Sequence, residues 1–246
     1  MTFYPMAAPN KLNKFSPQPH AIRYLSTFLG MLIGAMAAKV RIRGKHNLPK
    51  EGPFIIASNH FSYIDPPMIV YAMCKVINFI GASDQVIKWY YMWVPILYGF
   101  IPVNRKNVAP STIKTASKAL KNGEILCIYP EGHLGERVLR PARSGVVILS
   151  TLTNAPIVPV SIWGAETALS GLKKGLRPDI EIRIGKPFGP FELPREKEEK
   201  KRRIELIGKE IMHQIAASLP DDRHGVFFGD KRISDIRKKY DLPVPE

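Results

Sequence analysis

The sequence predicts an α/β fold in which a largely parallel or mixed sheet is flanked by helices, with an N-terminal membrane-associated helical segment. From residue 53 onward, short apolar runs of strand length alternate with longer segments of helical periodicity. Most of the short runs are apolar throughout, as expected for strands that are covered on both faces of a sheet. A charge-free segment of helix length lies upstream of them.

Six apolar runs have the length and composition of strands. The last of them alternates isoleucines with charged residues, so we expect it at an edge or half exposed. The longer segments have helical periodicity, and residues 194–218 predict one long, charged, amphipathic helix with a buried isoleucine stripe. The predicted strands are 54–57, 76–80, 100–103, 125–129, 157–162 and 180–184, and the shorter predicted helices are 68–75, 110–121 and 143–153.

The chain carries a large excess of positive charge. Its 246 residues suit one sizeable domain, and the formal net charge is +15. Such a surplus indicates an anionic partner, which can be nucleic acid, an anionic membrane or a phosphorylated substrate. The two cysteines, Cys74 and Cys127, stand in apolar contexts without metal-ligand spacing, which is typical of reduced thiols in a cytosol-facing protein.

The N-terminal region combines basic residues with an apolar segment. Residues 1–20 are basic and Pro-rich and predict a disordered arm, and residues 21–39 predict a membrane-associated helix ahead of one domain at 40–246. The charge-free part, 24–38, would span ~22 Å as a helix, against ~30 Å of bilayer hydrocarbon. It therefore suits a segment lying in one leaflet, with its basic flanks on anionic head groups. A buried core helix and a cleaved signal peptide are the alternatives.

His60 and Asp65 form the most informative pair. At ~100° per residue, a separation of five cannot place both side chains on one helical face, so they meet only if the chain turns tightly. The predicted strand before His60 and Pro66 after Asp65 favour such a turn at the carboxyl end of a strand, where open α/β sheets bind ligands. A histidine oriented by a carboxylate is a general base for a hydroxyl or a water. The alternative role of Asp65 is an N-cap of the following helix.

Two more predicted strands are followed by polar residues. The run ending at Val103 leads to Arg105, which can bind a phosphate bidentately. The run 125–129 leads to Glu131 and Gly132, where the carboxylate can accept hydrogen bonds and the glycine permits a positive φ. Three strands with this layout indicate one site at one edge of the sheet. A surface arginine and an ordinary turn are the simpler readings of Arg105 and of Glu131.

Four blocks in this order resemble those of the glycerolipid acyltransferase family, specifically the bacterial 1-acyl-sn-glycerol-3-phosphate acyltransferases. Residues 59–65 match the family's N-H-x4-D block, and 99–105 match G-x-I-P-V-x-R. Residues 129–132, Tyr-Pro-Glu-Gly, match the first half of F-P-E-G-T-R-S, and 155–160 match the V-P-V strand. The resemblance covers about residues 40–230.

The resemblance implies an acyltransferase that makes phosphatidic acid from a lysophospholipid and an acyl thioester. His60 would be the catalytic base and Asp65 its orienter, while Arg105, Glu131 and Gly132 would bind the glycerol-phosphate end of the acceptor. It implies no metal and no cofactor, because acyl-coenzyme A or acyl-carrier protein acts as a co-substrate. The expected partners are an anionic membrane surface and possibly acyl carrier protein, without nucleic acid, and the expected location is the cytoplasmic face of the cell membrane, peripheral or monotopic.

The chain departs from the family pattern after Gly132. Residues 133–135 are His-Leu-Gly where the family usually has Thr-Arg-Ser. Arg137, Arg140 and Arg143 are candidates to supply the missing charge, and otherwise the acceptor is a different lysolipid.

Two other classes compete with an acyltransferase. A metal-dependent phosphohydrolase would use His60, Asp65 and His133, although the acid spacing matches no recognised metal pattern. A non-catalytic protein that binds lipid or nucleic acid would use the positive charge alone, although the basic residues form no nucleic-acid-reading motif.

Overall fold

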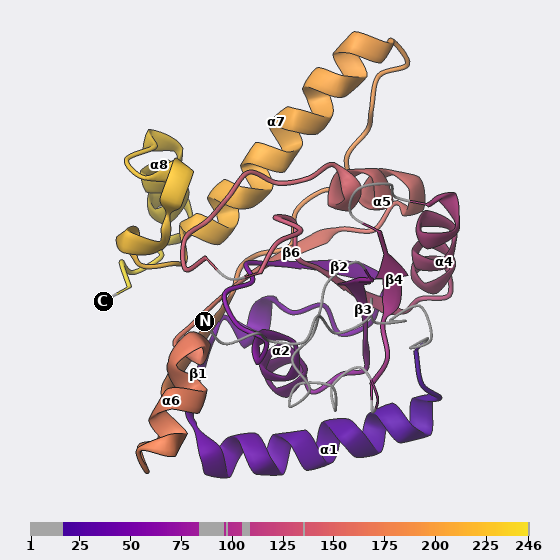
Figure 1. Ribbon diagram of the computed structural model, residues 1–246. Coiled ribbons are helices and arrows are strands. Elements are labelled where there is room, and N and C mark those ends of the chain that lie inside the picture. The colour runs from indigo at the N-terminus through magenta and orange to yellow at the C-terminus, as the bar shows by residue number, and fades with distance from the viewer. Residues whose placement is uncertain (1–16, 84–95, 97, 105–108, 135, 246) are drawn as a thin grey trace, which may run out of the picture.

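A seven-stranded mixed sheet forms the centre of the part of the chain that our computed structural model describes, residues 17–83, 96, 98–104, 109–134 and 136–245 (Figure 1). The strand order is β1-β7-β6-β2-β5-β3-β4. The strands are β1 Lys39–Arg43, β2 Phe54–Ser58, β3 Ile77–Ala82, β4 Ile101–Val103, β5 Ile125–Ile128, β6 Ile157–Trp163 and β7 Asp179–Ile184.

Strands β4, β3, β5, β2 and β6 run parallel to one another. β7 runs antiparallel to β6, and β1 runs parallel to β7. The predicted mixed sheet and all six predicted strands are therefore confirmed. Residues 1–16 of the predicted N-terminal arm lie outside the described residues.

The expectation that the last predicted strand lies at an edge is wrong. β7 lies between β6 and β1, and its residues from Ile180 onward are buried. The edge is occupied by β1, which the sequence analysis did not predict. Every second residue of β1 is basic and exposed, which is a common protection of an edge strand against pairing with another chain.

Helices cover both faces of the sheet (Figure 1). α4, α5 and α7 lie on one face, with α8 packed on α7, and α1 and α2 lie on the other. The helices are α1 His20–Ala37, α2 Asp65–Met73, α4 Pro110–Lys121, α5 Gly145–Thr153, α6 Ala168–Lys173, α7 Lys197–Ala216 and α8 Lys231–Tyr240, with short 3₁₀ helices at Lys45–Asn47, Ala165–Thr167, Asp221–Arg223 and Gly225–Phe227.

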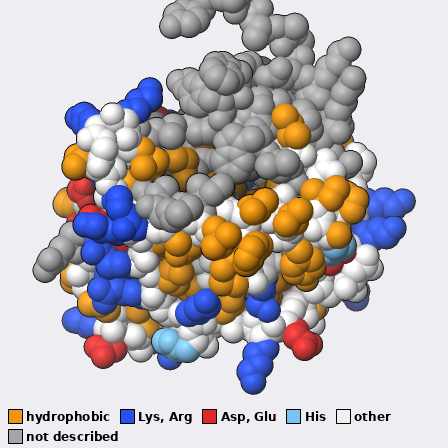
Figure 2. Space-filling model, turned by 90° about the horizontal axis from the view of Figure 1, so that it is seen from below, with side chains coloured by type: hydrophobic (Ala, Val, Ile, Leu, Met, Phe, Trp, Pro, Cys, Tyr) orange, Lys and Arg blue, Asp and Glu red, His pale blue; other side chains and the backbone are white. Residues whose placement is uncertain are grey.

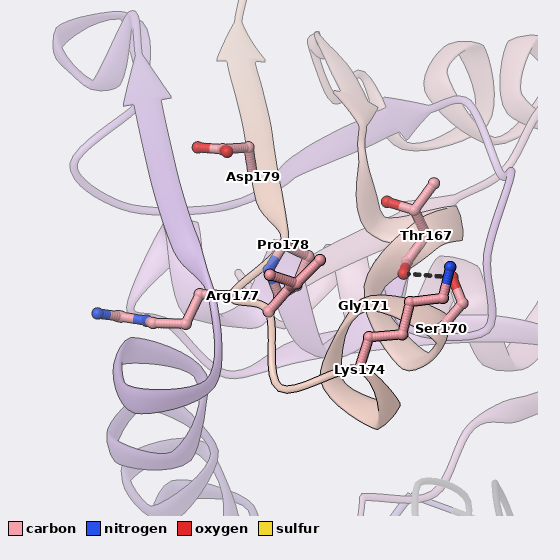
Figure 3. A pocket seen from close by; sticks show the side chains of 8 residues that line it. Thr167, Ser170, Gly171, Lys174, Arg177, Pro178 and Asp179 are labelled. Carbon is pink, nitrogen blue, oxygen red and sulfur yellow. Dashed lines mark hydrogen bonds between the residues drawn. The ribbon is translucent and has the colours of Figure 1, made fainter.

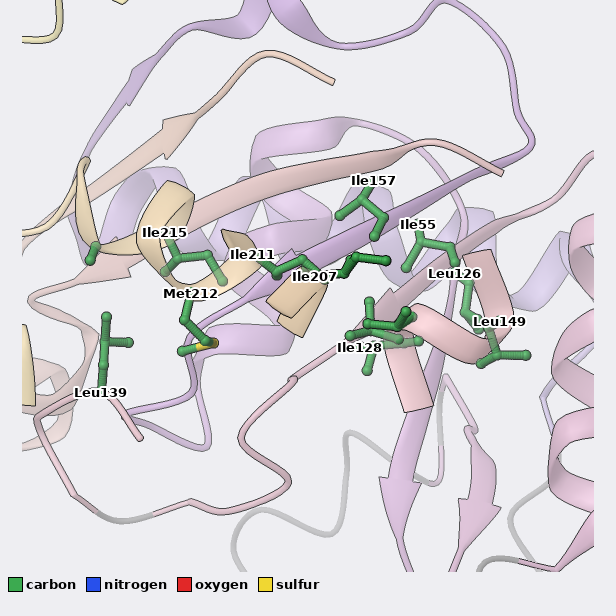
Figure 4. Packing of buried hydrophobic residues seen from close by; sticks show 14 of the residues in the cluster. Ile55, Leu126, Ile128, Leu139, Leu149, Ile157, Ile207, Ile211, Met212 and Ile215 are labelled. Atoms are coloured by element: carbon green, nitrogen blue, oxygen red, sulfur yellow. The ribbon is translucent and has the colours of Figure 1, made fainter. Parts of the chain in front are cut away.

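The strands divide their apolar side chains between the two layers, as the two-residue period of a strand requires. Ile55 and Leu126 pack under α5 and α7, whereas the neighbouring Ile56 and Cys127 pack against the α2 layer. Figure 4 shows the first of these clusters, where the isoleucine stripe of α7 lies on the sheet. The predicted stripe is confirmed, because Ile207, Ile211 and Ile215 are buried and Ile204 is partly buried against the same cluster.

α1 has one face on the protein and one face exposed. Its inner face buries Arg23, which hydrogen-bonds to Asn78 and to the carbonyl of Ile77, and Gly34, which packs against Tyr71 of α2. The opposite face exposes a row of large apolar side chains: Ile22, Leu25, Leu29 and Leu32, with Tyr24 and Phe28 beside them. Among the described residues, no helix combines the length and apolarity needed to cross a bilayer.

Candidate active site

The carboxyl ends of β2 and β5 lie side by side, because these strands are parallel and Ala57 pairs with Ile128. The polar residues that follow the two strands therefore leave the sheet at the same edge. His60 comes two residues after β2, and Glu131 comes three residues after β5. The structure thus brings together two of the site residues that the sequence predicted.

His60 and Asp65 meet across a tight turn, as predicted. Nδ1 of His60 lies 3.0 Å from Oδ2 of Asp65. The same oxygen accepts the backbone N–H groups of Phe61 and Ser62 at 2.8 and 2.7 Å. The imidazole is 17 % exposed and the carboxylate only 1 % exposed. The base is therefore partly accessible from outside, whereas the carboxylate that orients it is buried.

The predicted N-cap role of Asp65 is wrong. α2 begins at Asp65 itself, with Ile64 in the cap position. The carboxylate accepts hydrogen bonds from Phe61 and Ser62, which precede the helix, and not from N–H groups of its first turn. The backbone N–H of Asp65 donates to the carbonyl of Ser62 at 3.1 Å, which closes the turn. The carboxylate therefore holds the turn and the imidazole rather than the first turn of α2.

This contact selects one tautomer of His60. Burial raises the pKa of Asp65 above its ordinary value, and the hydrogen bond from His60 is the largest cause that opposes the rise. The three donors around Oδ2 favour the charged carboxylate. A carboxylate only accepts, so Nδ1 of His60 donates the proton in this contact and Nε2 keeps its lone pair. A lone pair on Nε2 is what a general base requires.

Two neighbours fix the position of the His60 turn and ring. Asn59 is fully buried, and its amide donates to the carbonyl of Ile162 at 2.7 Å and accepts from the backbone N–H of Ile162 at 2.9 Å. These bonds fasten the end of β2 to β6. The ring of Tyr129, which follows β5, stacks on the imidazole with a centroid distance of 3.9 Å and an interplanar angle of 14°. Neither residue was predicted to have a role, although Asn59 lies in the N-H-x4-D block and Tyr129 begins the Tyr-Pro-Glu-Gly block.

Glu131 is a buried carboxyl group at the edge of the site. Its Oε2 accepts the backbone N–H of Arg140 at 2.9 Å, while Oε1 is buried without a hydrogen-bond partner among the described residues. Burial raises the pKa of Glu131 to about 7, and the backbone N–H groups of Arg140 and His60 limit the rise. An acidic group with one unsatisfied oxygen can bind a hydroxyl of a substrate.

Gly132 and Arg143 lie against each other. Gly132 has a φ of +60°, and a Cβ built on it would lie 2.7 Å from Nε of Arg143. The backbone N–H of Arg143 also donates to the carbonyl of Pro130 at 2.8 Å. The predicted need for glycine is thus explained by both the positive φ and the close approach of this guanidinium.

The three candidate arginines differ in where they lie. The guanidinium of Arg140 pairs with Glu136, and Arg137 is exposed. Arg143 is the one whose side chain contacts the Pro-Glu-Gly loop. Arg105 lies outside the described residues. The last described residue before it is Asn104, which directly follows β4.

A C-terminal segment also holds the loop that follows Glu131. The backbone N–H of Leu139 donates to the carbonyl of Arg223 at 2.9 Å. The guanidinium of Arg223 forms an ion pair with Glu166 at 3.1 Å. Gly225 packs so closely that a Cβ there would lie 2.2 Å from the carbonyl oxygen of Leu139. Because Leu139 precedes Arg140, this packing places the N–H group that holds Glu131. No motif in the sequence signals this contact.

The described residues do not support the metal-dependent phosphohydrolase alternative. Among them, no three side chains of His, Cys, Asp or Glu come together as a metal site would require. His133, which that alternative needs beside His60 and Asp65, is exposed on the loop after Gly132.

A family model described as Acyltransferase matches residues 39–163, half of the chain. This chain belongs to the acyltransferase family. The matched region contains both His60 and Glu131 and ends with the last residue of β6.

Known proteins support the same assignment. The acyltransferase is 32 % identical over 160 residues to the 1-acyl-sn-glycerol-3-phosphate acyltransferase of Bacillus subtilis, which covers 64 % of this chain and 77 % of the relative. It is 27 % identical over 134 residues to the human 1-acyl-sn-glycerol-3-phosphate acyltransferase alpha, covering 50 % of this chain and 44 % of that one.

A solved structure has the same fold. The crystal structure of the 1-acyl-sn-glycerophosphate acyltransferase from Thermotoga maritima aligns with a TM-score of 0.53 and 24 % sequence identity. The alignment covers 76 % of this chain and 78 % of that chain, so the fold is shared over most of both.

Proposed function

We propose that this acyltransferase moves a fatty acyl group from a thioester to the sn-2 hydroxyl of 1-acylglycerol 3-phosphate, giving phosphatidic acid for phospholipid biosynthesis. The observation that carries the proposal is the contact of His60 with Asp65 at the strand edge, next to Glu131. The name of the Bacillus subtilis relative, a 1-acyl-sn-glycerol-3-phosphate acyltransferase, supports this choice of acceptor.

The geometry supports direct transfer. Nε2 of His60 takes the proton of the acceptor hydroxyl as its oxygen bonds to the thioester carbonyl carbon. The carbon–sulfur bond then breaks, and the imidazolium returns the proton to the leaving thiolate. Asp65 stabilises the imidazolium between the two steps. A positioned base supplies roughly 10²–10⁴-fold in rate by this route.

A covalent acyl-cysteine is not needed, and Cys127 does not suit that role. It is fully buried in β5, and burial raises the pKa of its thiol far above the ordinary value. A thiol held neutral is a poor nucleophile. The proposal also needs no metal or cofactor, because acyl-coenzyme A or acyl-carrier protein brings the activated acyl group.

The acceptor head group would lie between Glu131 and Arg105. β4 is two strands from β5, the strand that leads to Glu131, about 10 Å at the usual strand spacing. Arg105 follows β4 in the sequence, and an arginine is suited to bind a phosphate bidentately. Glu131 would accept a hydrogen bond from the glycerol end, and Gly132 leaves room for Arg143 beside it.

We further propose peripheral or monotopic attachment to the cytoplasmic face of the membrane through α1. Its exposed row of apolar side chains has no cover among the described residues, and its one arginine is buried on the inner face. Such a helix lies in the interface with its apolar face among the acyl chains. The two cysteines are free, which suits a reducing compartment.

The proposal is tested by an acyl-transfer assay with a panel of lysolipids, each offered with acyl-coenzyme A and with acyl-carrier protein. We expect 1-acylglycerol 3-phosphate to have the highest kcat/KM. The second candidate, a different lysolipid acceptor, is favoured by Leu134, which stands where the family usually has arginine. A zwitterionic lysolipid that reacts faster would establish the second candidate, and the absence of transfer to any lysolipid would refute both.

A further inference from the structure

The corner between α6 and β7, residues 171–178, exposes apolar and basic side chains together. Leu172 is 42 % exposed and Leu176 is 62 % exposed. Lys173 and Lys174 stand between them and are also exposed. Two leucines beside two lysines suit an anionic lipid surface, because the leucines enter the acyl region while the ammonium groups stay at the head groups.

The backbone of this corner holds Leu176 in the open. Gly175 has a φ of +70°, its N–H donates to Leu172 at 3.0 Å, and the N–H of Leu176 donates to Gly171 at 3.0 Å. In this type of helix ending, the residue after the left-handed glycine usually packs on the residue that receives its N–H bond. Here that residue is Gly171, which offers no side chain for Leu176 to pack on, and Leu176 stays exposed.

The corner is fastened to the end of α1. The guanidinium of Arg177 donates to the carbonyls of Ala35 and Ala38 at 2.6 and 3.1 Å. The backbone N–H of Lys39 donates to the carbonyl of Pro178 at 2.9 Å. The exposed leucines of the corner are therefore held in a constant position relative to the apolar face of α1.

The corner and α1 lie at the same side of the molecule. In Figure 1, α6 descends beside β1 to the level of α1, and Figure 2 shows apolar side chains across this underside with Lys and Arg at its margins. A hollow of about 300 Å³ lies in the corner. Figure 3 shows side chains that line it, with Ser170 and Lys174 at α6 and Asp179 on β7. Arg41 lies 3.6 Å from Asp179 and offsets its charge.

The corner also lies at the edge that carries the active site. β7 runs antiparallel to β6, with Glu181 paired to Trp163, so β7 starts where β6 ends. β6 is parallel to β2, whose end leads to His60. A membrane that contacts this corner is therefore next to the edge of the sheet where the acceptor must bind.

From these observations we infer that the α6–β7 corner is a second contact with an anionic membrane, in addition to α1. The membrane would then contact two sites, α1 and the corner, which are held together by hydrogen bonds. Two such contacts orient the active-site edge toward the lipid. The inference rests on the proposed attachment through α1, and the test separates the two.

The test places a fluorescent label that brightens in apolar surroundings on single cysteines. Cys74 is first replaced by serine, and Cys127 is fully buried, so Leu176→Cys, Phe28→Cys and Val226→Cys each offer one reactive thiol. Phe28 reports on α1, and Val226, 66 % exposed in the segment that packs against Leu139, is the matched control. Each protein is mixed with vesicles of phosphatidylglycerol and phosphatidylcholine, with and without nitroxide-labelled acyl chains.

We expect the labels at 176 and 28 to brighten and to be quenched by the nitroxide, and the label at 226 to stay unchanged. A response at 28 without one at 176 overturns the second contact and leaves attachment through α1 intact. A lack of response at both positions overturns both proposals. Equal responses at all three positions mean unspecific adsorption and also overturn the inference.

The charge of the corner is tested separately. Lys173→Gln with Lys174→Gln should weaken binding to the anionic vesicles, by roughly fivefold for each lysine near the surface. The matched control is Lys200→Gln with Lys201→Gln on the exposed start of α7, which removes the same charge elsewhere. Equal weakening by both pairs would show that only the net charge matters, which contradicts the inference.

Discussion

The two halves of the active site are built in opposite ways. The His60 half is local, because the single turn at residues 60–65 supplies the base, its carboxylate and the two N–H groups that hold the carboxylate. The Glu131 half is assembled from distant parts, since its carboxylate is held by the N–H of Arg140, and that stretch is held in turn by Arg223. A local turn keeps its geometry whenever β2 is in place, whereas the second half depends on packing across almost 100 residues of sequence.

The difference matches the two tasks of the site. The base must keep one tautomer and one direction in every turnover, and a short closed turn achieves this with few degrees of freedom. The acceptor side has to suit one head group, and a loop whose position depends on tertiary packing can change without disturbing the base. The departure at residues 133–135 falls on the second half.

The largest expected effect comes from removing the base. His60→Ala should lower kcat by at least the roughly 10²–10⁴-fold that a positioned base supplies. The fold should survive, because His60 stands after the strand and is partly exposed. Acyl-transfer rates and thermal unfolding measure the two effects, with the exposed His46→Ala as the control. Activity within a few-fold of the unchanged enzyme would refute the mechanism.

Asp65→Asn should come next, with a loss in kcat of roughly 10²–10⁴-fold. One oxygen accepts from His60, Phe61 and Ser62, so an amide oxygen in that position can keep these hydrogen bonds but lacks the negative charge. Without that charge, the imidazolium that forms when His60 takes the proton of the acceptor hydroxyl is no longer stabilised. The pH dependence of kcat measures this, and a variant with full activity would show that the carboxylate only supports the turn.

Glu131→Gln should change the pH dependence of stability. The folded-state pKa is about 7 against 4.5 for the free group, so the folded enzyme binds this proton more tightly. The contribution of this proton to the free energy of unfolding is therefore complete below pH 4.5. It is lost as the pH rises toward 7, which lowers the stability by up to ~3 kcal/mol. Glutamine stays neutral at every pH, so the variant should gain stability relative to the unchanged enzyme between pH 4.5 and 7. Denaturant unfolding at several pH values measures this gain, and a constant difference would contradict the raised pKa.

The smallest expected effect is on acceptor binding. Arg105→Ala should raise the KM for 1-acylglycerol 3-phosphate about tenfold and leave the KM for the acyl donor unchanged, since a charge-assisted hydrogen bond contributes ~1.5–3 kcal/mol. Arg202→Ala, an exposed arginine of α7, is the control. Steady-state kinetics with each substrate varied in turn separate the two KM values. An unchanged acceptor KM would remove Arg105 from the site.

The helices and strands that lie in the core were predictable from sequence, because burial imposes a pattern on each of them. The interior strands are continuous apolar runs, and α7 carries its isoleucine stripe at helical spacing. β1, α6 and α8 were missed. β1 and α6 have only five and six residues, and α8 buries only Ile233 and Ile236, so each carries too little pattern to be distinguished from a loop. The position of β7 was predicted wrongly for the same reason, because its neighbour β1 was not expected.

The sequence by itself determined that His60 and Asp65 meet, because a five-residue separation followed by Pro66 restricts the chain to a turn and both partners lie within it. Only the tertiary structure decided that Asn59 binds Ile162 of β6, that Tyr129 stacks on the His60 ring, and that Arg143 rather than Arg140 lies against Gly132. These contacts join separate strands and loops through packing, and no spacing within one segment encodes how two segments approach each other.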